Sequence, residues 1–196
     1  RKFEYKIQKK AYKKSIAAKP IFFNNNFMIY EYEKGIHKIV LSNKEIKNLV
    51  SKVKIFHKFK IKEKPYDLKN DFLNYSKILK DEKNTLRIKE SLKILKRIKI
   101  SKKDLVLCHH DLNPKNIIFK KSHIKIIDWE YAGINNRFFD LAALCVEFNL
   151  NKKKQQVLLN TYFDKHQKNH IRKLNQFKII YSNLCHLWFD KLKTLK

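Results

Sequence analysis

The chain has 196 residues, a formal net charge of +28 at pH 7 and a hydrophobic content of 43%. This length suits one domain, or one domain with part of another, and the hydrophobic content is that of a globular protein rather than a disordered tail. The sequence contains no apolar run near the roughly 18 residues of a membrane helix. Its first ten residues, RKFEYKIQKK, lack the apolar centre of a signal peptide.

The cysteines and the charge suggest the setting in which the protein works. Cys108, Cys145 and Cys185 are scattered, odd in number and without metal-ligand spacing, which favours reduced thiols in the cytoplasm over a disulfide framework. The charge is compatible with nucleic-acid binding or with attraction to acidic partners or a membrane surface. However, the lysines are spread along the whole chain, and glycine and proline are scarce, a joint bias that indicates an AT-rich genome. A nucleic-acid-binding module is therefore the less favoured alternative.

The first third of the chain predicts a helix, a hairpin and a second helix. Phe3, Ile7 and Ala11 recur at helical spacing over residues 3–14. Residues 19–23 and 27–32 are rich in apolar and aromatic side chains and flank three asparagines, which favours a β-hairpin. Over residues 42–59 the apolar positions form one helical face, and a serine and a glutamate three residues apart form a capping box at its start.

The segments that follow predict further helices. Residues 60–71 favour a loop, residues 72–79 a short helix, and residues 138–148, 151–166 and 170–193 show helical spacing. Gly133 is expected in a turn that needs unusual backbone angles. Asn84 is expected to cap a long helix whose inward-facing residues are Leu86, Leu92, Leu95 and Ile98.

The stretch VLCHHDLNPKNIIFKKSHIKIIDWE, residues 106–130, predicts a strand, a loop and two short paired strands. Pro114 excludes a continuous helix through the loop. The two apolar runs at 117–119 and 124–127 are separated by a plausible turn. If they pair, Asn116 and Asp128 lie at the same end of a hairpin, and Asp111 lies one loop away.

These three residues suit phosphoryl transfer. The reaction needs a carboxylate that orients the attacking hydroxyl, and oxygen ligands for the magnesium ion on the phosphates. Asp111 is the candidate for the first task. Asn116 and Asp128 supply the hard oxygen ligands that magnesium prefers. The pattern H-x-D-x-x-x-x-N followed by apolar-apolar-Asp is close to a kinase catalytic loop and its metal-binding aspartate.

Three ordered blocks, CHHDLNPKNIIF, IIDWEYAG and NRFFDLAALCVEF, carry a more specific resemblance. The chain resembles the choline/ethanolamine kinase branch of the aminoglycoside-phosphotransferase-like kinases, most closely over residues 107–147. The resemblance implies an α+β, protein-kinase-like fold with a mainly helical large lobe. Residues 1–35 would be the remnant of the nucleotide-binding small lobe and its hinge, and residues 36–196 the catalytic and substrate-binding lobe. ATP and Mg²⁺ would be the cofactors, and a small amino alcohol, choline first, the acceptor.

The resemblance also implies roles for residues outside the catalytic loop. Glu4 would pair with a phosphate-gripping lysine, although a surface carboxylate is the alternative. The adenine would lie against the backbone of the hinge at Glu31, Tyr32 and Glu33. His109 would support the catalytic loop, and Asp140 would hold it down.

On the acceptor side, the resemblance places Glu147, Trp188 and Glu130 at the substrate. Aromatic faces hold a quaternary ammonium, and Trp188 matches the second tryptophan of a W-x-x-W pattern, whereas Cys185 stands in place of the first. The alternatives are a solvent-facing glutamate and a core tryptophan. His110 could also touch the substrate.

The chain departs from complete kinases of this type in one respect. They have a phosphate-covering loop and a strand lysine ahead of the helix that carries Glu4, and neither is found. With Gly35 and Gly133 as its two glycines, the chain has no G-x-G loop. We therefore expect a fragment with intact catalytic residues, which could be inactive alone. Thiamine, a sugar or an aminoglycoside are the alternative acceptors.

Overall fold

The computed structural model describes residues 2–121, 123–164 and 167–194. It is an α+β structure in which seven helices surround three small antiparallel sheets within the described residues. The helices are α1 (Lys2–Lys13), α2 (Asn43–Phe56), α3 (Leu68–Ile78), α4 (Glu82–Arg97), α5 (Phe138–Glu147), α6 (Lys152–Phe163) and α7 (Lys168–Thr194). The strands are β1 (Pro20–Phe23), β2 (Met28–Tyr30), β3 (Leu105–Cys108), β4 (Ile117–Lys120), β5 (His123–Ile126) and β6 (Gly133–Asn136).

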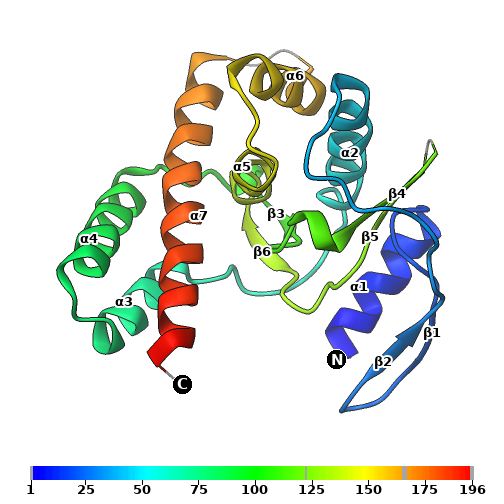
Figure 1. Ribbon diagram of the computed structural model, residues 1–196, viewed down its shortest axis with the longest axis horizontal. Coiled ribbons are helices and arrows are strands. Elements are labelled where there is room, and N and C mark those ends of the chain that lie inside the picture. Colours follow the sequence, from blue (N-terminus) through cyan, green and yellow to red (C-terminus); the bar gives the residue numbers. More distant parts are fainter. Residues whose placement is uncertain (1, 122, 165–166, 195–196) are drawn as a thin grey trace.

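The helix α5 lies at the centre of the molecule. Its first eight residues, 138–145, are all buried, and it packs along α7, which runs the height of the molecule (Figure 1). The pair α3 and α4 lies on the far side of α7, whereas α2 and α6 pack together on the other side of α5. One continuous apolar cluster joins residues of α1, α2, α5 and α7. Among the helices described, none is both long and apolar enough to cross a membrane.

Most predicted elements are present, with shifted bounds. The hairpin β1–β2 forms, and Ser42 and Glu45 complete the capping box at the start of α2. Helix α3 begins at Leu68, four residues earlier than expected, because the Asp67 side chain accepts a hydrogen bond from the Asn70 backbone N–H. The last two predicted helices correspond to α6 and α7, and residues 165–166 lie outside the described part.

Two expectations for α4 were wrong. Asp81, not Asn84, caps this helix, and its carboxylate accepts the Asn84 backbone N–H at 2.9 Å. Leu86 does not face inward, since 59% of it is exposed. The buried residues of α4 are instead Asn84, Ile88 and Ser91, and the amide of Asn183 on α7 donates to the Ser91 hydroxyl at 3.1 Å. The contact between α4 and α7 is therefore partly polar, which apolar periodicity cannot reveal.

The expectation for Gly133 was also wrong. This glycine has no positive φ and opens β6, a strand that the sequence did not predict. β6 pairs antiparallel with β3, so that Cys108 lies opposite Gly133. The strand is short and carries two asparagines, and its apolar pattern is too weak to be recognised.

Gly35 is the glycine whose missing side chain the fold requires. The segment after β2 crosses β4, where Ile36 and Phe119 exchange two backbone hydrogen bonds of 3.0 and 2.9 Å. A Cβ atom on Gly35 would lie 2.4 Å from the Ile118 side chain and 2.7 Å from the Phe119 carbonyl oxygen. The crossing therefore leaves no space for even one methyl group.

We predict that Gly35→Ala destabilises the protein by about 1–3 kcal/mol, the usual cost of overpacking. The matched control is Gly133→Ala, whose Cβ would meet its nearest atom at 3.4 Å, an ordinary contact. Urea unfolding of the two variants and the wild type measures both effects. Equal midpoints for Gly35→Ala and Gly133→Ala would contradict the prediction.

Candidate active site

The β4–β5 hairpin places Asn116 and Asp128 at one end, as its predicted pairing requires. Ile117 lies opposite Ile126, and the Ile127 backbone N–H donates to the Asn116 carbonyl at 3.0 Å. Asp128 follows directly and has a φ of 62°, a left-handed conformation that aspartate adopts more readily than most residues. The chain thus turns sharply at the residue that is expected to bind metal.

The Asp111 carboxylate is held by two side-chain amides. Asn113 Nδ2 donates to Oδ1 at 2.8 Å, and Asn116 Nδ2 donates to Oδ2 at 2.7 Å. Asn113 also caps the short turn at Pro114–Asn116 by accepting from the Lys115 and Asn116 backbone N–H groups. The sequence NPKN therefore fixes both the shape of the loop and the orientation of its carboxylate.

His109 connects the loop to the hairpin. Its ring is fully buried, with Nε2 3.0 Å from the Ile127 carbonyl and Nδ1 3.3 Å from the Asp111 backbone nitrogen. Because the carbonyl can only accept and the N–H can only donate, Nε2 carries the proton and Nδ1 is the acceptor. Burial lowers the pKa of His109. The neutral ring thus joins Ile127, the residue before Asp128, to the backbone of Asp111.

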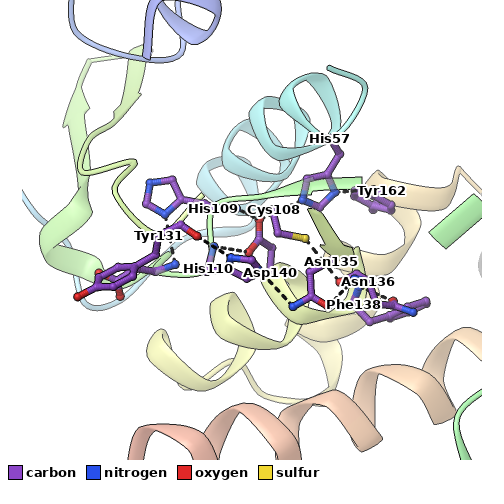
Figure 2. A network of polar contacts seen from close by, with 11 residues as sticks. His57, Cys108, His109, His110, Tyr131, Asn135, Asn136, Phe138, Asp140 and Tyr162 are labelled. Carbon is purple, nitrogen blue, oxygen red and sulfur yellow. Dashed lines mark hydrogen bonds and ion pairs between the residues drawn. The ribbon is translucent and has the colours of Figure 1, made fainter. Parts of the chain in front are cut away.

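Asp140, at the start of α5, lies beneath the catalytic loop and is fully buried (Figure 2). One carboxylate oxygen accepts from the His109 backbone N–H at 2.8 Å and from His57 Nε2 at 3.1 Å. The other oxygen accepts from the His110 backbone N–H at 3.0 Å. His57 in turn lies 2.7 Å from the Tyr162 hydroxyl through Nδ1. One carboxylate therefore joins α2, α5, α6 and the loop.

The charge state of this network follows from its surroundings. Burial alone would raise the pKa of Asp140, but the hydrogen bonds from the His57 ring and from the His109 backbone outweigh it and lower that pKa. Burial lowers the pKa of His57, so a neutral imidazole donates to an ionised carboxylate. The Cys108 thiol lies close enough to both for a metal site, but the Asp140 oxygens and the His57 nitrogens are already used by these hydrogen bonds.

His110 has a constrained backbone and a fully engaged ring. Its φ is 71°, and its ring nitrogens lie 2.7 Å from the Tyr131 carbonyl and 2.9 Å from the Asn135 amide nitrogen. Tyr66 packs against the ring with a centroid distance of 5.0 Å. These contacts fix the orientation of the His110 ring next to Asp111. A contact of His110 with the substrate stays a prediction.

The oxygen atoms at the loop and hairpin fit a divalent cation. Burial raises the pKa of Asp128, and the nearby carboxylates of Glu130, Asp111 and Glu4 raise it further. Concentrated negative charge of this kind favours a bound cation over separate carboxylates. The hydrogen bonds of Asn116 to Asp111 use its amide nitrogen, and carboxylate and amide oxygens are hard ligands suited to Mg²⁺.

On the acceptor side, Glu147 at the end of α5 is half-buried and not solvent-facing. The Tyr181 hydroxyl of α7 donates to its carboxylate at 2.9 Å. Burial raises the pKa of Glu147, and the charge of Asp111 adds to the rise. The Cys185 thiol lies beside the same groups, since the charges of Glu147 and Asp111 contribute to its raised pKa. Glu147 and Cys185 therefore lie near enough to Asp111 to feel its charge.

The other predicted substrate residues lie nearer the surface. Trp188 is 45% exposed and contacts Phe189 edge to face at 5.0 Å, so it is not a core tryptophan. Glu130 is exposed, and its charge raises the pKa of the neighbouring Tyr131.

The predicted nucleotide residues fall into two groups. Glu4 is buried on α1, and its charge reaches both Tyr30 and Asp128. In the segment after β2, Tyr32 is 88% exposed. Its neighbours form ion pairs with lysines, Glu31 with Lys19 at 3.3 Å and Glu33 with Lys125 at 3.4 Å.

Sequence reasoning missed two residues that the structure brings to the site. His57 is buried with both ring nitrogens hydrogen-bonded, and nothing in the sequence linked it to Asp140. Tyr181 lies four residues before Cys185 on α7, and this helical spacing from the position of the missing tryptophan was the available signal.

The family follows from the chain as a whole. The family described as choline/ethanolamine kinase matches residues 1–183. The protein belongs to the choline/ethanolamine kinase family. Protein LicA of Haemophilus influenzae is 36% identical over 96 residues, which cover 44% of this chain and 27% of that protein. A thiamine kinase of Escherichia coli is 36% identical over 75 residues, 36% of this chain and 26% of that protein.

Solved structures of this kinase superfamily show the same fold. The choline kinase LicA of Streptococcus pneumoniae superimposes with a TM-score of 0.78 at 18% identity, covering 96% of this chain and 71% of that one. The amicoumacin kinase hAmiN, in complex with AMP-PNP, Ca²⁺ and amicoumacin, gives a TM-score of 0.75 at 13% identity, covering 96% and 69%. The predicted α+β, protein-kinase-like fold is confirmed. The chain spans only 27% to 58% of the length of its first three LicA-type relatives.

The buried histidines predict a pH dependence of stability. An imidazole in the unfolded chain has a pKa of about 6.5, and the pKa of His57 in the folded protein is lower. The unfolded state thus binds a proton that the folded state does not, so the free energy of unfolding falls as the pH drops below about 6.5. His57→Gln keeps a donor for Asp140 and removes this titration. We predict a shallower fall for His57→Gln than for the wild type between about pH 7 and 5.

Urea unfolding across this pH range measures the slope. His123→Gln, which removes an exposed imidazole at the start of β5, is the control and should keep the wild-type slope. His109, whose pKa burial also lowers, keeps the His57→Gln slope from vanishing. If the wild type and His57→Gln lose stability in parallel, the assignment of a neutral His57 is wrong.

Proposed function

We propose that this protein functions as an ATP- and Mg²⁺-dependent phosphotransferase. Its acceptor would be the hydroxyl of a small amino alcohol, with choline as the first candidate. The observation that carries the proposal is the geometry of the loop and hairpin, in which Asp111, Asn116 and Asp128 converge. The membership in the choline/ethanolamine kinase family supports it, as does the nucleotide analogue in the complex of hAmiN.

In this proposal Asp111 acts on the acceptor. Its carboxylate would orient the attacking hydroxyl and take its proton, and its two amide donors fix the orientation of the oxygen atoms. Asn116 and Asp128 would hold Mg²⁺, which supplies neutralisation of phosphate charge when bound. His109 and Asp140 would act through the backbone of the loop, so they are positioning residues.

The acceptor would lie between the loop that carries Asp111 and the part of α7 that carries Tyr181 and Trp188. Glu147 is half-buried and close to Asp111, so its carboxylate is suited to an ammonium group whose hydroxyl reaches Asp111. Tyr181 fixes Glu147 by donating to it. Trp188 and Glu130 would complete the rim, since an aromatic face and a carboxylate both attract a quaternary ammonium.

In the same proposal, the two lobes have separate functions. Residues 1–35 would contribute the end of the nucleotide-binding lobe, with Glu4 near the phosphates and Glu31, Tyr32 and Glu33 at the adenine. Residues 36–196 would contribute catalysis and acceptor binding.

Thiamine is the second candidate acceptor. A thiamine kinase is among the relatives at 36% identity, and thiamine combines a positively charged ring with a primary hydroxyl. The site offers the same features to both acceptors, namely a carboxylate for the cation and a second carboxylate for the hydroxyl.

We predict that Asp111→Asn lowers the turnover number by about 10²- to 10⁴-fold, because the amide cannot accept the hydroxyl proton. The measurement is ADP release with ATP and Mg²⁺ across choline, ethanolamine, thiamine and an aminoglycoside. Circular dichroism and the melting temperature confirm that the variant folds. Near-wild-type turnover in Asp111→Asn would refute the proposed role. If no acceptor gives ADP release, the same assay on a version extended upstream of Arg1 decides whether the chain lacks part of the kinase or is not a kinase.

We predict that Glu147→Gln raises the KM for choline about tenfold, which corresponds to about 1.4 kcal/mol of lost binding. The amide keeps the shape of the side chain and removes the charge that the ammonium requires. The KM for ATP should not change. The matched control, Glu82→Gln, removes an exposed charge at the start of α4 and should leave both constants unaltered. An unchanged KM for choline in Glu147→Gln would place the acceptor elsewhere.

A further inference from the structure

A second cavity lies away from the candidate active site, between the end of α4 and the first turns of α7. Its volume is about 690 Å³, within the range of about 300–1,000 Å³ typical of small-molecule sites. In Figure 1 these two helix ends lie near each other at the upper part of α7. The lining residues are Arg97, Ile98, Lys99, Ser101, Asn169, Arg172, Lys173 and Gln176.

The lining of this cavity is strongly basic and polar. Two arginines and two lysines face a serine, an asparagine and a glutamine, and no carboxylate is among the lining residues. None of the candidate active-site residues lines the cavity. The Ser101 hydroxyl accepts the Lys103 backbone N–H, which fixes the loop that leaves α4. The cavity is thus a separate site of positive charge with hydrogen-bonding groups around it.

The arginines are the informative part of the lining. The chain has 46 basic residues, and its arginines are Arg1, Arg87, Arg97, Arg137 and Arg172. Almost all basic residues of this chain are lysines, so an arginine is a departure from the background composition. We therefore look for a contact that needs the guanidinium group. The planar guanidinium binds phosphate and carboxylate through two parallel hydrogen bonds, which lysine cannot do. Two of these scarce arginines line one cavity.

The ion pairs of the described residues separate the arginines further. Arg87 pairs with Asp190 at 3.5 Å and Arg137 with Asp104 at 3.4 Å. In the described part of the chain, no ion pair joins Arg97 or Arg172 to a carboxylate. Arg172 donates to the side-chain oxygen of Asn169 at 3.0 Å, which orients it at the cavity. Among the arginines that the structure describes, the two without an ion pair to a carboxylate are therefore the two that share this cavity.

A basic residue at Arg97 has one simpler explanation, which is the partial negative charge at the end of α4. That effect favours any cation by about 0.3–1 kcal/mol. Lys96 already serves it in the same last turn, and a lysine at position 97 would serve it equally. It also gives no reason for an arginine near the start of α7, where the partial charge is positive. The pair of arginines needs an explanation that involves both helices.

We propose that this cavity binds a phosphate-bearing ligand, held by the guanidinium groups of Arg97 and Arg172. Lys99 adds charge from the loop after α4. Lys173 forms an ion pair with Asp104, which directly precedes β3. Its charge is therefore partly neutralised, and it adds little net positive charge to the cavity. The first turn of α7 contributes its partial positive charge. The source of the phosphate is either a soluble phosphate compound or the headgroup of an anionic lipid.

The test is binding of inorganic tripolyphosphate to the purified chain, measured by calorimetry without Mg²⁺. In the variant Arg97→Gln/Arg172→Gln we expect the affinity to fall at least about tenfold, the loss of two charge-assisted contacts. In Arg97→Lys/Arg172→Lys, which keeps the charge, we expect a loss of at least about threefold. The matched control is Lys89→Gln/Lys93→Gln, which removes the same charge from residues of α4 that do not line the cavity and should stay within about twofold of the wild type. The melting temperatures of all variants verify folding.

The outcomes are distinct. Equal losses in the arginine variants and the lysine control would show general attraction to a basic surface and overturn the proposal, as would the absence of binding to the wild type. Full affinity in the double lysine variant would overturn the role of the guanidinium groups. Co-sedimentation with phosphatidylglycerol vesicles separates the sources. Loss of vesicle binding in the double glutamine variant assigns the site to a lipid headgroup, and tripolyphosphate binding without vesicle binding assigns it to a soluble compound.

Discussion

The buried carboxylate of Asp140 is the interaction on which the catalytic loop depends. It accepts the backbone N–H groups of His109 and His110 and the ring of His57, so it ties the loop to helices that are far apart in the sequence. A buried carboxylate is costly unless it is fully hydrogen-bonded, and here the donors satisfy it. Because two of them are backbone groups, Asp140 fixes the start of the loop at His109 and His110, whereas Asn113 shapes its tip.

The cost of burying charge also applies to the neighbouring carboxylates of the candidate site. Asp111, Asp128 and Glu4 are close enough to influence one another, and burial and their mutual repulsion raise the pKa of Asp128. A fold does not place carboxylates together to gain stability, since like charges oppose each other. In the proposed site, a divalent cation would make the arrangement favourable. The amide donors on Asp111 would serve a related purpose, because they hold one carboxylate in a fixed direction beside the proposed metal ligands.

The sequence predicted this site better than it predicted the surroundings of the site. The arrangement of residues 108–128 is determined locally, because a proline turn and two adjacent strands bring the Ile127 backbone N–H to the Asn116 carbonyl. Contacts between distant elements had no such local signal. β6 carries two asparagines and little apolar pattern, the interface of α4 with α7 is polar at Ser91, and the contact of His57 with Asp140 joins residues 83 positions apart. Periodicity detects apolar faces, so it fails where a buried surface is made of hydrogen bonds.

Composition explains why the charge of +28 is a weak guide to function and why its distribution is a better one. Lysines spread along most of the chain raise the net charge without creating a site, because an exposed ammonium is well solvated and costs little. A residue choice that departs from the background carries more information. The arginines at positions 87 and 137 are explained by ion pairs within the fold, whereas those at 97 and 172 converge on one cavity without such partners in the described chain. Carboxylates inside the protein hold the first pair, whereas the guanidinium groups of the second pair are exposed, and in our proposal they bind an anion from outside the protein.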